Sequence, residues 1–285
     1  MANNKSYLLG VDVGGTNIKA VLFNGQKTVL DSSLGTPKDS LDHLLIMISA
    51  LVEPLLKRAA ADKKKIAGLG LGVAGIIDPK EKKIMDSPNL PFLNGVKLSE
   101  IVAQKLNLPA EIDNDAECFL RAEVLLGGAV KYKNVYGLTL GTGIGGAWWF
   151  NNDIYYGAHG LSEPGRLIID TKNGATLEAA YQQLTQNNPR FLAVEAYRGD
   201  ILATRAYEEI GQILGLACAN IVNLLDPEAI ILGGGVMESA ELFLPAIKKI
   251  IEEKLIVAAG RKIKIIKGRL GAEAGALGAA LLIKQ

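Results

Sequence analysis

The chain has little cysteine and little histidine, with two residues of each among 285. Cys118 and Cys218 lie in segments with helical patterning and form no C-x-x-C pair, so a disulfide framework is excluded and two buried, reduced thiols are expected. Excess charge is also lacking, because 31 Lys and Arg residues balance 30 Asp and Glu residues to a net charge of +1. A strongly basic protein is therefore excluded, and neither nucleic acid nor an anionic membrane is expected as a partner.

Long hydrophobic runs are missing as well. Glycines or charges interrupt each apolar stretch before it reaches the length of a membrane span. Residues Met1–Ser6 lead directly into a strand-like segment and lack the apolar core of a signal peptide, so a cytoplasmic protein is expected. The composition of 49% hydrophobic and 21% charged residues is globular, and the chain is long enough for two lobes.

Strand-like segments alternate with segments of helical spacing, which predicts an α/β fold. The clearest strand patterns are Tyr7–Val13, Asn17–Phe23, Thr28–Leu34, Ile66–Val73, Val135–Leu140 and Ala229–Leu232, and the clearest helix patterns are Leu41–Ala60, Ala116–Leu126, Ala175–Leu184, Asp200–Leu225, Ala240–Leu255 and Ala272–Ile283. Leu8–Thr16 and Tyr136–Ile144 repeat one pattern, an apolar strand that breaks at a Gly/Thr turn and returns as a strand. The repeat suggests a duplicated domain with a cleft between the copies.

The first Gly/Thr turn, Asp12–Lys19, can expose backbone N–H groups at a hairpin tip where glycine leaves no Cβ in the way. Successive N–H groups of this kind bind anions. Asp12 stands at the strand end, where it can hold a magnesium ion directly or through water, beside phosphates that Thr16 and the backbone contact. A plain hairpin turn is the alternative for this segment taken alone.

Two further glycine segments, Gly70–Gly75 and Gly141–Gly146, satisfy the G-x-G-x-x-G pattern of dinucleotide-binding proteins. That pattern requires a helix directly after the glycines, whereas strand-like or turn-like residues follow both segments here. A Walker A loop is absent from the sequence, so neither a Rossmann dehydrogenase nor a P-loop enzyme fits. Gly233–Gly235 does lie between a buried strand and a helix, where it allows either the approach of an adenosine or close helix–strand packing.

Asp115 lies where a short strand gives way to a helix, within the sequence Asp113-Asn114-Asp115. An aspartate near a helix N-terminus can act as the N-cap. It can also accept a proton from a substrate hydroxyl as that oxygen attacks a phosphorus atom. Both roles are open at this point.

Together these segments resemble the ROK family (repressors, open reading frames and sugar kinases) over nearly the whole chain, from Leu9 to about Leu282. Six motifs follow in the family's order, namely Asp12–Lys19, Gly70–Gly75 with Asp78, Ser87–Pro91, Asn114–Ala116, Leu140–Gly146 and Ile231–Val236. The resemblance implies the actin-like ATPase (ribonuclease H-like) fold, an α/β fold of two lobes with a central cleft. We expect a smaller lobe at residues 1–112 and 271–285, and a larger lobe at residues 113–270.

The resemblance also implies an activity, that of an ATP-dependent sugar kinase acting on a hydroxyl such as O6 of glucose or of an N-acyl hexosamine. Asp115 is then the catalytic base, and Asp12 organises Mg²⁺ through water. The implied sugar ligands are Asn89, Asn114, Glu163, Glu178 and Gly75. The implied ATP ligands are Asp12, Gly14, Gly15, Thr16, Lys19, Thr142, Gly143, Gly234 and Gly235.

The chain departs from the family pattern after the second hairpin. Ser162–Arg166 stands where the family has Gly-Glu-Ile-Gly-His, and Thr176–Glu178 stands where it has Cys-Leu-Glu. Arg166 cannot replace a zinc-binding histidine, because a guanidinium has no acceptor lone pair. No cysteine occurs from Phe119 through Ala217, so the family's structural zinc is expected to be missing.

Arg166 leaves the substrate open, because it can contact a hydroxyl or an anionic group of the substrate, or pair with Glu163 or Glu178. A catalytically degenerate sugar sensor and a polyphosphate-dependent glucokinase are the alternatives to an ATP-dependent kinase. A family repressor would carry a helix-turn-helix ahead of the first phosphate strand, and this sequence reaches that strand by Tyr7. A homodimer is the family's usual assembly.

Overall fold

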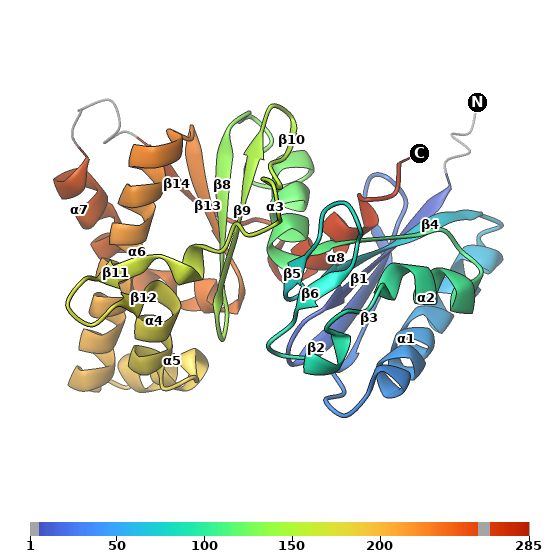
Figure 1. The fold of residues 1–285 in the computed structure, drawn as a ribbon, viewed down its shortest axis with the longest axis horizontal. Coiled ribbons are helices and arrows are strands. Elements are labelled where there is room, and N and C mark those ends of the chain that lie inside the picture. Colours follow the sequence, from blue (N-terminus) through green and yellow to red (C-terminus); the bar gives the residue numbers. More distant parts are fainter. Residues whose placement is uncertain (1–5, 256–262, 285) are drawn as a thin grey trace. The chain divides into compact units, whose positions relative to one another are not determined.

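The computed structural model describes residues 6–255 and 263–284, and Figure 1 shows the course of the chain. The described residues form two compact units. Unit 1 takes its residues from Met1–Glu123, Tyr156–Leu161 and Ala272–Gln285, and unit 2 from Val124–Tyr155 and Ser162–Gly271. The lobe boundary expected after residue 112 stays a prediction.

Unit 1 is built on a five-stranded sheet with the order β3-β2-β1-β4-β7. Its strands are β1 (Tyr7–Val13), β2 (Asn17–Phe23), β3 (Thr28–Gly35), β4 (Ile66–Val73) and β7 (Ala110–Asn114), and its helices are α1 (Leu41–Ala61), α2 (Leu98–Leu106), the first part of α3 (Asp115–Leu125) and α8 (Ala274–Ala280). The short β5 (Ile76–Ile77), β6 (Ile84–Asp86) and the 3-10 turns η1 (Pro91–Leu93) and η5 (Gly271–Glu273) complete the elements. The first three strands are antiparallel, and β1, β4 and β7 are parallel.

The two faces of β1 carry different residues because side chains alternate along a strand. Leu9, Val11 and Val13 are fully buried and pack in the core that α1 and α2 cover. The opposite face lies under α8, and glycines let the helix come close. A Cβ at Gly10 would lie 1.8 Å from the Ala276 carbonyl oxygen.

The repeated glycines of β4 likewise allow helices to pack closely on the sheet. A Cβ at Gly70 would lie 1.7 Å from the Ala279 carbonyl oxygen, and one at Gly72 would lie 3.2 Å from Cys118 Sγ. Only strand or turn residues follow this segment, as predicted, since Gly75 leads into β5. The G-x-G-x-x-G match at Gly70–Gly75 therefore reflects helix–sheet packing at its first two glycines.

Unit 2 is built on a second five-stranded sheet with the order β10-β9-β8-β13-β14. Its strands are β8 (Val135–Leu140), β9 (Ile144–Phe150), β10 (Asp153–Ile154), β13 (Ala229–Gly233) and β14 (Lys264–Lys267), and its helices are α4 (Leu177–Thr185), α5 (Pro189–Tyr197), α6 (Ile201–Leu225) and α7 (Leu244–Lys254). The two-stranded ribbon of β11 (Ile168–Asp170) and β12 (Ala175–Thr176) precedes α4. The 3-10 segment η2 (Pro164–Arg166) precedes this ribbon, and the 3-10 segment η3 (Gly235–Leu242) precedes α7. Residues of α4, α5, α6 and α7 share one core with the sheet.

The two sheets have the same topology. Each has three antiparallel strands followed by two parallel ones, and the Gly/Thr turns at Gly14–Asn17 and Gly141–Gly143 each join the first two strands. The internal repeat predicted from the sequence is therefore present in the fold.

Some predicted boundaries were wrong. The helix expected from Ala240 begins at Leu244, because η3 precedes it, and the helix expected from Ala175 begins at Leu177, after β12. Helix α5 was not predicted, although Pro189 at its first turn and the Asn188 side chain, which accepts from the Phe191 N–H, are typical N-terminal signals.

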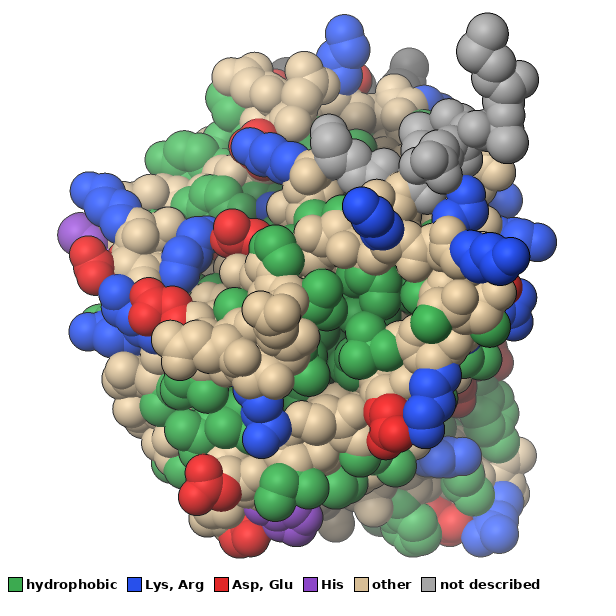
Figure 2. All heavy atoms as spheres, turned by 90° about the vertical axis from the view of Figure 1, so that its right-hand side faces the viewer, with side chains coloured by type: hydrophobic (Ala, Val, Ile, Leu, Met, Phe, Trp, Pro, Cys, Tyr) green, Lys and Arg blue, Asp and Glu red, His purple; other side chains and the backbone are tan. Residues whose placement is uncertain are grey.

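Cys118 and Cys218 are buried and free, which confirms the expected thiols. Among the described residues, no helix combines the length and apolarity needed to cross a membrane. On the face shown in Figure 2, Lys and Arg side chains lie among Asp and Glu side chains, in keeping with the balanced charge of the sequence.

Candidate functional site

The first hairpin joins β1 to β2, and its tip leaves backbone donors available. Val13 and Ile18 form the last strand pair, and the Gly14 N–H donates to the Asn17 carbonyl at 3.1 Å. The N–H groups of Gly15 and Thr16 have no hydrogen-bond partner within the described part of the chain. Two successive free amides at a glycine tip fit an anion such as a phosphate.

Asp12 stands two residues before this tip, on the face of β1 that lies under α8. Its register partner on β2 is Lys19. The carboxylate lies against Gly275 of α8, where a Cβ would be only 2.4 Å from Asp12 Oδ2. Burial and, as a smaller effect, the negative charge of Asp115 raise the pKa of Asp12, whereas Lys19 lowers it, and the net pKa is about 7. Asp115 therefore lies close enough to Asp12 to affect the ionisation of its carboxyl group.

Asp115 is the first residue of α3, and its neighbour Asn114 caps the helix. The Asn114 side-chain oxygen accepts from the N–H groups of Ala116 at 2.7 Å and Glu117 at 3.2 Å. The capping role that was one alternative for Asp115 thus belongs mainly to Asn114. Burial raises the pKa of Asp115, and bonds from backbone N–H groups, including that of Ala116, oppose the rise.

The site around the Asp12 carboxylate, with Asp115 nearby, fits a magnesium ion. Two enclosed carboxyl groups with raised pKa values gain from a nearby cation, and Mg²⁺ commonly binds one or two carboxylates together with phosphate and water oxygens. No group of three or more His, Cys, Asp or Glu side chains that could hold a metal occurs in residues 6–255 and 263–284. Phosphate and water oxygens would therefore supply the remaining ligands.

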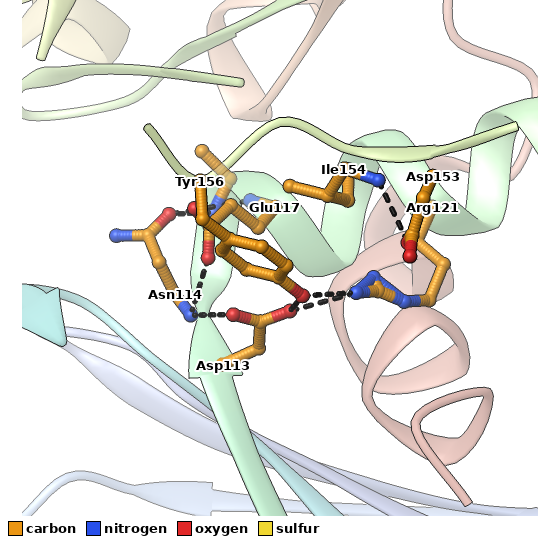
Figure 3. Close-up of polar contacts among 8 residues, drawn as sticks. Asp113, Asn114, Glu117, Arg121, Asp153, Ile154 and Tyr156 are labelled. Carbon is orange, nitrogen blue, oxygen red and sulfur yellow. Dashed lines mark hydrogen bonds and ion pairs between the residues drawn. The ribbon is translucent and has the colours of Figure 1, made fainter. Parts of the chain in front are cut away.

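A buried polar network joins Asp113, at the end of β7, to residues of α3 and to Tyr156 (Figure 3). Asp113 is 2% exposed, and its Oδ2 accepts from Arg121 Nη2 and from the Tyr156 hydroxyl, both at 2.8 Å. Arg121 Nη2 also donates to the Tyr156 hydroxyl at 2.8 Å, and Arg121 Nη1 is buried without a hydrogen-bond partner in the described structure. The Asn114 N–H, in turn, donates to Asp113 Oδ1 at 3.2 Å and to Glu117 Oε2 at 3.3 Å.

Two carboxyl groups of the network, those of Asp113 and Glu117, lie near a single positive charge, that of Arg121. Burial and the adjacent Asp113 raise the pKa of Glu117, which favours a neutral Glu117 carboxyl group. Glu117, Arg121 and Tyr156 were not predicted from the sequence as site residues. Their signal was faint: charged residues at positions 4 and 8 after Asp113, in a helix with many apolar residues.

Three other predicted residues of unit 1 make contacts near these groups. Asn114 Nδ2 donates to the Gly75 carbonyl at 2.8 Å, and Gly75 has a φ of 146°, which favours glycine. A Cβ at Gly15 would lie 3.0 Å from the Asn89 side chain, so Asn89 packs against the tip of the first hairpin.

The second hairpin joins β8 to β9 in unit 2, and side chains from α4 contact its tip. The Ile144 N–H donates to Glu178 Oε2 at 2.8 Å, and the Tyr181 hydroxyl donates to the Gly141 carbonyl at 2.7 Å. The Gly141 N–H donates to the Gly143 carbonyl at 3.0 Å. The N–H groups of Thr142 and Gly143 have no partner among the residues that the structure describes, which again fits an anion.

The glycines after β13 lie directly beside this hairpin. Gly233 pairs with Thr139 of β8, and a Cβ at Gly234 would lie 2.2 Å from the Leu140 carbonyl oxygen. Gly234 also has a φ of 89°, and a Cβ at Gly235 would meet no atom within 4 Å. The segment predicted for adenosine and the second predicted phosphate turn are thus neighbours in unit 2.

Glu163 directly precedes the 3-10 segment η2 of the same unit, and Arg166 is the last residue of η2. Burial and, as a smaller effect, the charge of Glu163 raise the pKa of Tyr136, whereas a hydrogen bond with Ser162 lowers it, and the net pKa is about 12. Glu163 therefore lies near β8. The Arg166 side chain is exposed. The Thr176 hydroxyl accepts from the Ala179 N–H at 3.3 Å and caps α4, which gives this residue a structural role.

Comparisons with known proteins identify two kinds of relatives. The glucokinase of Halalkalibacterium halodurans is 28% identical, over 98% of this chain and 95% of that protein. The xylose repressor of Caldicellulosiruptor bescii is 27% identical, over 97% of this chain and 77% of the repressor.

A solved structure, that of a ROK family glucokinase from Streptomyces griseus in complex with glucose and AMPPNP, is 26% identical, with a TM-score of 0.82 over 98% of this chain and 99% of the other. The fold is therefore the actin-like ATPase fold expected for such kinases. The family model of the ROK family matches residues 8–173 and 170–285. The chain thus belongs to the ROK family.

Proposed function

We propose that the protein is an ATP-dependent sugar kinase, which transfers the γ-phosphoryl group to a hydroxyl, O6 of a hexose such as glucose or an N-acyl hexosamine. The observation that carries the proposal is the pair Asp12 and Asp115, two enclosed carboxyl groups that interact beside a hairpin tip with free amides. The similarity to glucokinases over nearly the whole chain supports it. In this proposal the protein acts in the cytoplasm, as a homodimer.

Asp115 is the base in this mechanism. The sugar hydroxyl oxygen attacks the γ-phosphorus, the bond from that phosphorus to the β,γ-bridging oxygen breaks, and the hydroxyl proton moves to an Asp115 carboxylate oxygen. A raised pKa suits this role, because a base whose pKa lies nearer to neutrality holds the transferred proton better. Asn114, fixed by its bonds to Gly75 and to the start of α3, is held beside that base.

The other predicted residues divide between sugar and donor. Asn89, Asn114, Glu163, Glu178 and Gly75 would bind the sugar hydroxyls, while Gly14, Gly15, Thr16, Lys19, Thr142, Gly143, Gly234 and Gly235 would bind ATP. Asp12 would hold Mg²⁺ through water, and the bound ion would offset negative charge on the phosphates. Free amides at both hairpins and the open space at Gly235 support the donor assignments.

A sugar-binding protein without turnover is the second candidate, because xylose repressors match the chain as well as glucokinases do. The test is a coupled kinase assay over a panel of hexoses and hexosamines, run in parallel with ATP and with polyphosphate. Phosphorylation of a sugar with ATP supports the proposal. Phosphorylation with polyphosphate but not with ATP would show that polyphosphate, and not ATP, is the phosphoryl donor. Sugar binding without any transfer would establish the second candidate.

The Asp115→Asn variant tests the mechanism. Turnover is expected to fall by about 10²–10⁴-fold, since general-base catalysis contributes about that much, while sugar binding measured by calorimetry persists. Asp42→Asn, at an exposed position in the first turn of α1, serves as the matched control. Near-normal turnover in the Asp115 variant removes this residue from the role of base.

A further inference from the structure

Helix α4 touches the tip of the second hairpin with two side chains, and both contacts reach backbone atoms. Tyr181 donates to the Gly141 carbonyl, and Glu178 accepts from the Ile144 N–H. Glu178 and Tyr181 are three positions apart, so they lie on one face of the helix. The two contacts bracket Thr142 and Gly143, whose N–H groups are free of partners in the described structure.

The helix itself is firmly held. Leu177 and Tyr181 are fully buried, and the Leu177 N–H donates to the Leu167 carbonyl at 2.8 Å. Thr176 caps the helix and also pairs with Ile168 in the ribbon that precedes it. A helix fixed at its first turn and in its core is a rigid support for a loop that contacts it.

The hairpin is shaped to receive these side chains. A Cβ at Gly143 would lie 2.6 Å from Glu178 Oε2, so only glycine leaves room for the carboxylate at that position. Gly165 of η2 is also close, because a Cβ there would lie 3.2 Å from Glu178 Cβ. Glu178 is therefore enclosed between the hairpin tip and η2.

A glycine-rich tip that is not supported has many conformations, and a ligand must select the competent one at a cost in affinity. We propose that Tyr181 and Glu178 are positioning residues, which hold Gly141–Ile144 in the conformation that presents the Thr142 and Gly143 amides to the donor phosphates. This inference rests on the proposed function, since the ligand of the tip is the phosphate chain of ATP. It assigns to α4 a role in donor affinity that is separate from any contact of Glu178 with the sugar.

The structure offers a matched control for Tyr181. Tyr207 of α6 lies in the same core, and its hydroxyl donates to the Pro189 carbonyl at 2.8 Å. Tyr181→Phe and Tyr207→Phe thus each remove one buried hydroxyl and its bond to a carbonyl, but only the first bond reaches the hairpin. A purely structural role predicts similar effects for the two variants.

The experiment measures binding of Mg·ADP by calorimetry without sugar, and the KM values for ATP and for sugar. Tyr181→Phe is expected to weaken ADP binding and to raise the KM for ATP by about 3–10-fold, with an unchanged KM for sugar, as loss of one buried hydrogen bond predicts. Tyr207→Phe is expected to leave the nucleotide values within about twofold, at a similar loss of thermal stability. Equal nucleotide effects in both variants, or none in either, would overturn the inference.

Glu178 is tested through its acceptor atom. Glu178→Gln keeps a side-chain oxygen for the Ile144 N–H, whereas Glu178→Ala removes it, so only the alanine variant is expected to weaken ADP binding by about 3–10-fold. Amide hydrogen exchange of residues 139–145 is the second readout, and it is expected to be faster in Tyr181→Phe and Glu178→Ala than in the wild type.

Different results would contradict the kinase function and the support of the second hairpin by α4. If the wild type neither binds nucleotide nor transfers phosphate, the proposed function fails, and hydrogen exchange still tests the support of the tip. If the wild type is an active kinase but exchange and nucleotide affinity are the same in all variants, the support by α4 is wrong.

Discussion

The two Gly/Thr hairpins occupy the same place in their sheets but carry their charge differently. In the first, the residue before the last strand pair is Asp12, opposite Lys19. In the second, the corresponding pair is Thr139 and Gly145, which carry no charge. The carboxylate near the second tip comes instead from Glu178 on α4, and it accepts a backbone N–H of the hairpin.

Each carboxylate also lies against a glycine, and the two glycines belong to different elements. Asp12 packs on Gly275 of α8, outside its own hairpin, whereas Glu178 packs on Gly143 within the second tip. The first hairpin thus presents a charged group that helices enclose, and the second is itself held by a helix. Shared topology therefore does not imply shared chemistry. Changes that remove or displace the Asp12 carboxylate should lower turnover, and changes at the tip of the second hairpin should lower donor affinity.

Among changes that compare the two hairpins, the largest effect is expected from Asp12→Asn. Removing the carboxylate would leave the magnesium ion without its charged partner in the protein, and turnover at saturating substrates is expected to fall by about 10²–10³-fold. Steady-state kinetics check this, with Asp31→Asn on β3 as an exposed control. Turnover close to that of the wild type would show that the charge of the first hairpin serves no step of the transfer.

The same variant is expected to be more stable than the wild type at high pH. The pKa of Asp12 in the folded protein is about 7, above the ordinary value of 3.8, so the folded state holds the proton more tightly than the unfolded state does. Its contribution to stability is complete below pH 3.8 and is lost as the pH rises through 7. Asparagine avoids this loss, and the gain in free energy of unfolding should be about 1–3 kcal/mol larger at pH 8 than at pH 5.

Urea unfolding without metal or nucleotide measures that difference. A gain of the same size at both pH values contradicts the raised pKa. Added Mg·ADP should reduce the difference in free energy of unfolding between the variant and the wild type at pH 8, because a ligand that prefers the ionised carboxylate stabilises the wild type selectively.

Gly275→Ala tests how closely Asp12 must be placed. Alanine suits a helix better than glycine does, so α8 itself is not weakened, but the new Cβ would meet Asp12 Oδ2 at 2.4 Å. The carboxylate must move, and turnover is expected to fall about tenfold at saturating ATP, since catalysis is sensitive to displacements of about 1 Å. A raised KM for ATP with normal turnover would contradict this expectation, because Asp12 would then affect donor affinity, as the second hairpin does.

Local patterns were sufficient to predict the parts of the site that lie close together in sequence. The β1–β2 hairpin, with Asp12 before its glycines, and the start of α3 at Asp115 follow from strand alternation, turn residues and capping signals within about ten residues. The parallel register of β1, β4 and β7 then sets Asp12, Gly72 and Asp113 in one row across the sheet. Gly72, which has no side chain, separates the two carboxylates of that row.

The contacts that could not be predicted join distant segments. Tyr181 meets Gly141 across 40 residues, and Arg121 meets Tyr156 across 35. Periodicity assigns such residues to a helix or a loop but does not show which backbone atom their polar ends reach. Likewise, the sequence around Gly10 does not predict that Ala276 of α8 packs directly against this glycine.

The smallest effect is expected from Gly143→Ala, the counterpart of Gly275→Ala in the second hairpin. Its Cβ would meet Glu178 Oε2 at 2.6 Å, but this oxygen ends a flexible side chain and can move, so the tip loses one support rather than its fold. The KM for ATP is expected to rise about 3–5-fold, as for a weakened hydrogen bond, while turnover at saturating ATP stays within about twofold. Gly35→Ala, where a Cβ meets nothing within 4 Å, controls for the substitution itself. If Gly143→Ala lowers turnover instead of ATP affinity, the second hairpin takes part in the chemistry, and the division of labour between the two hairpins is wrong.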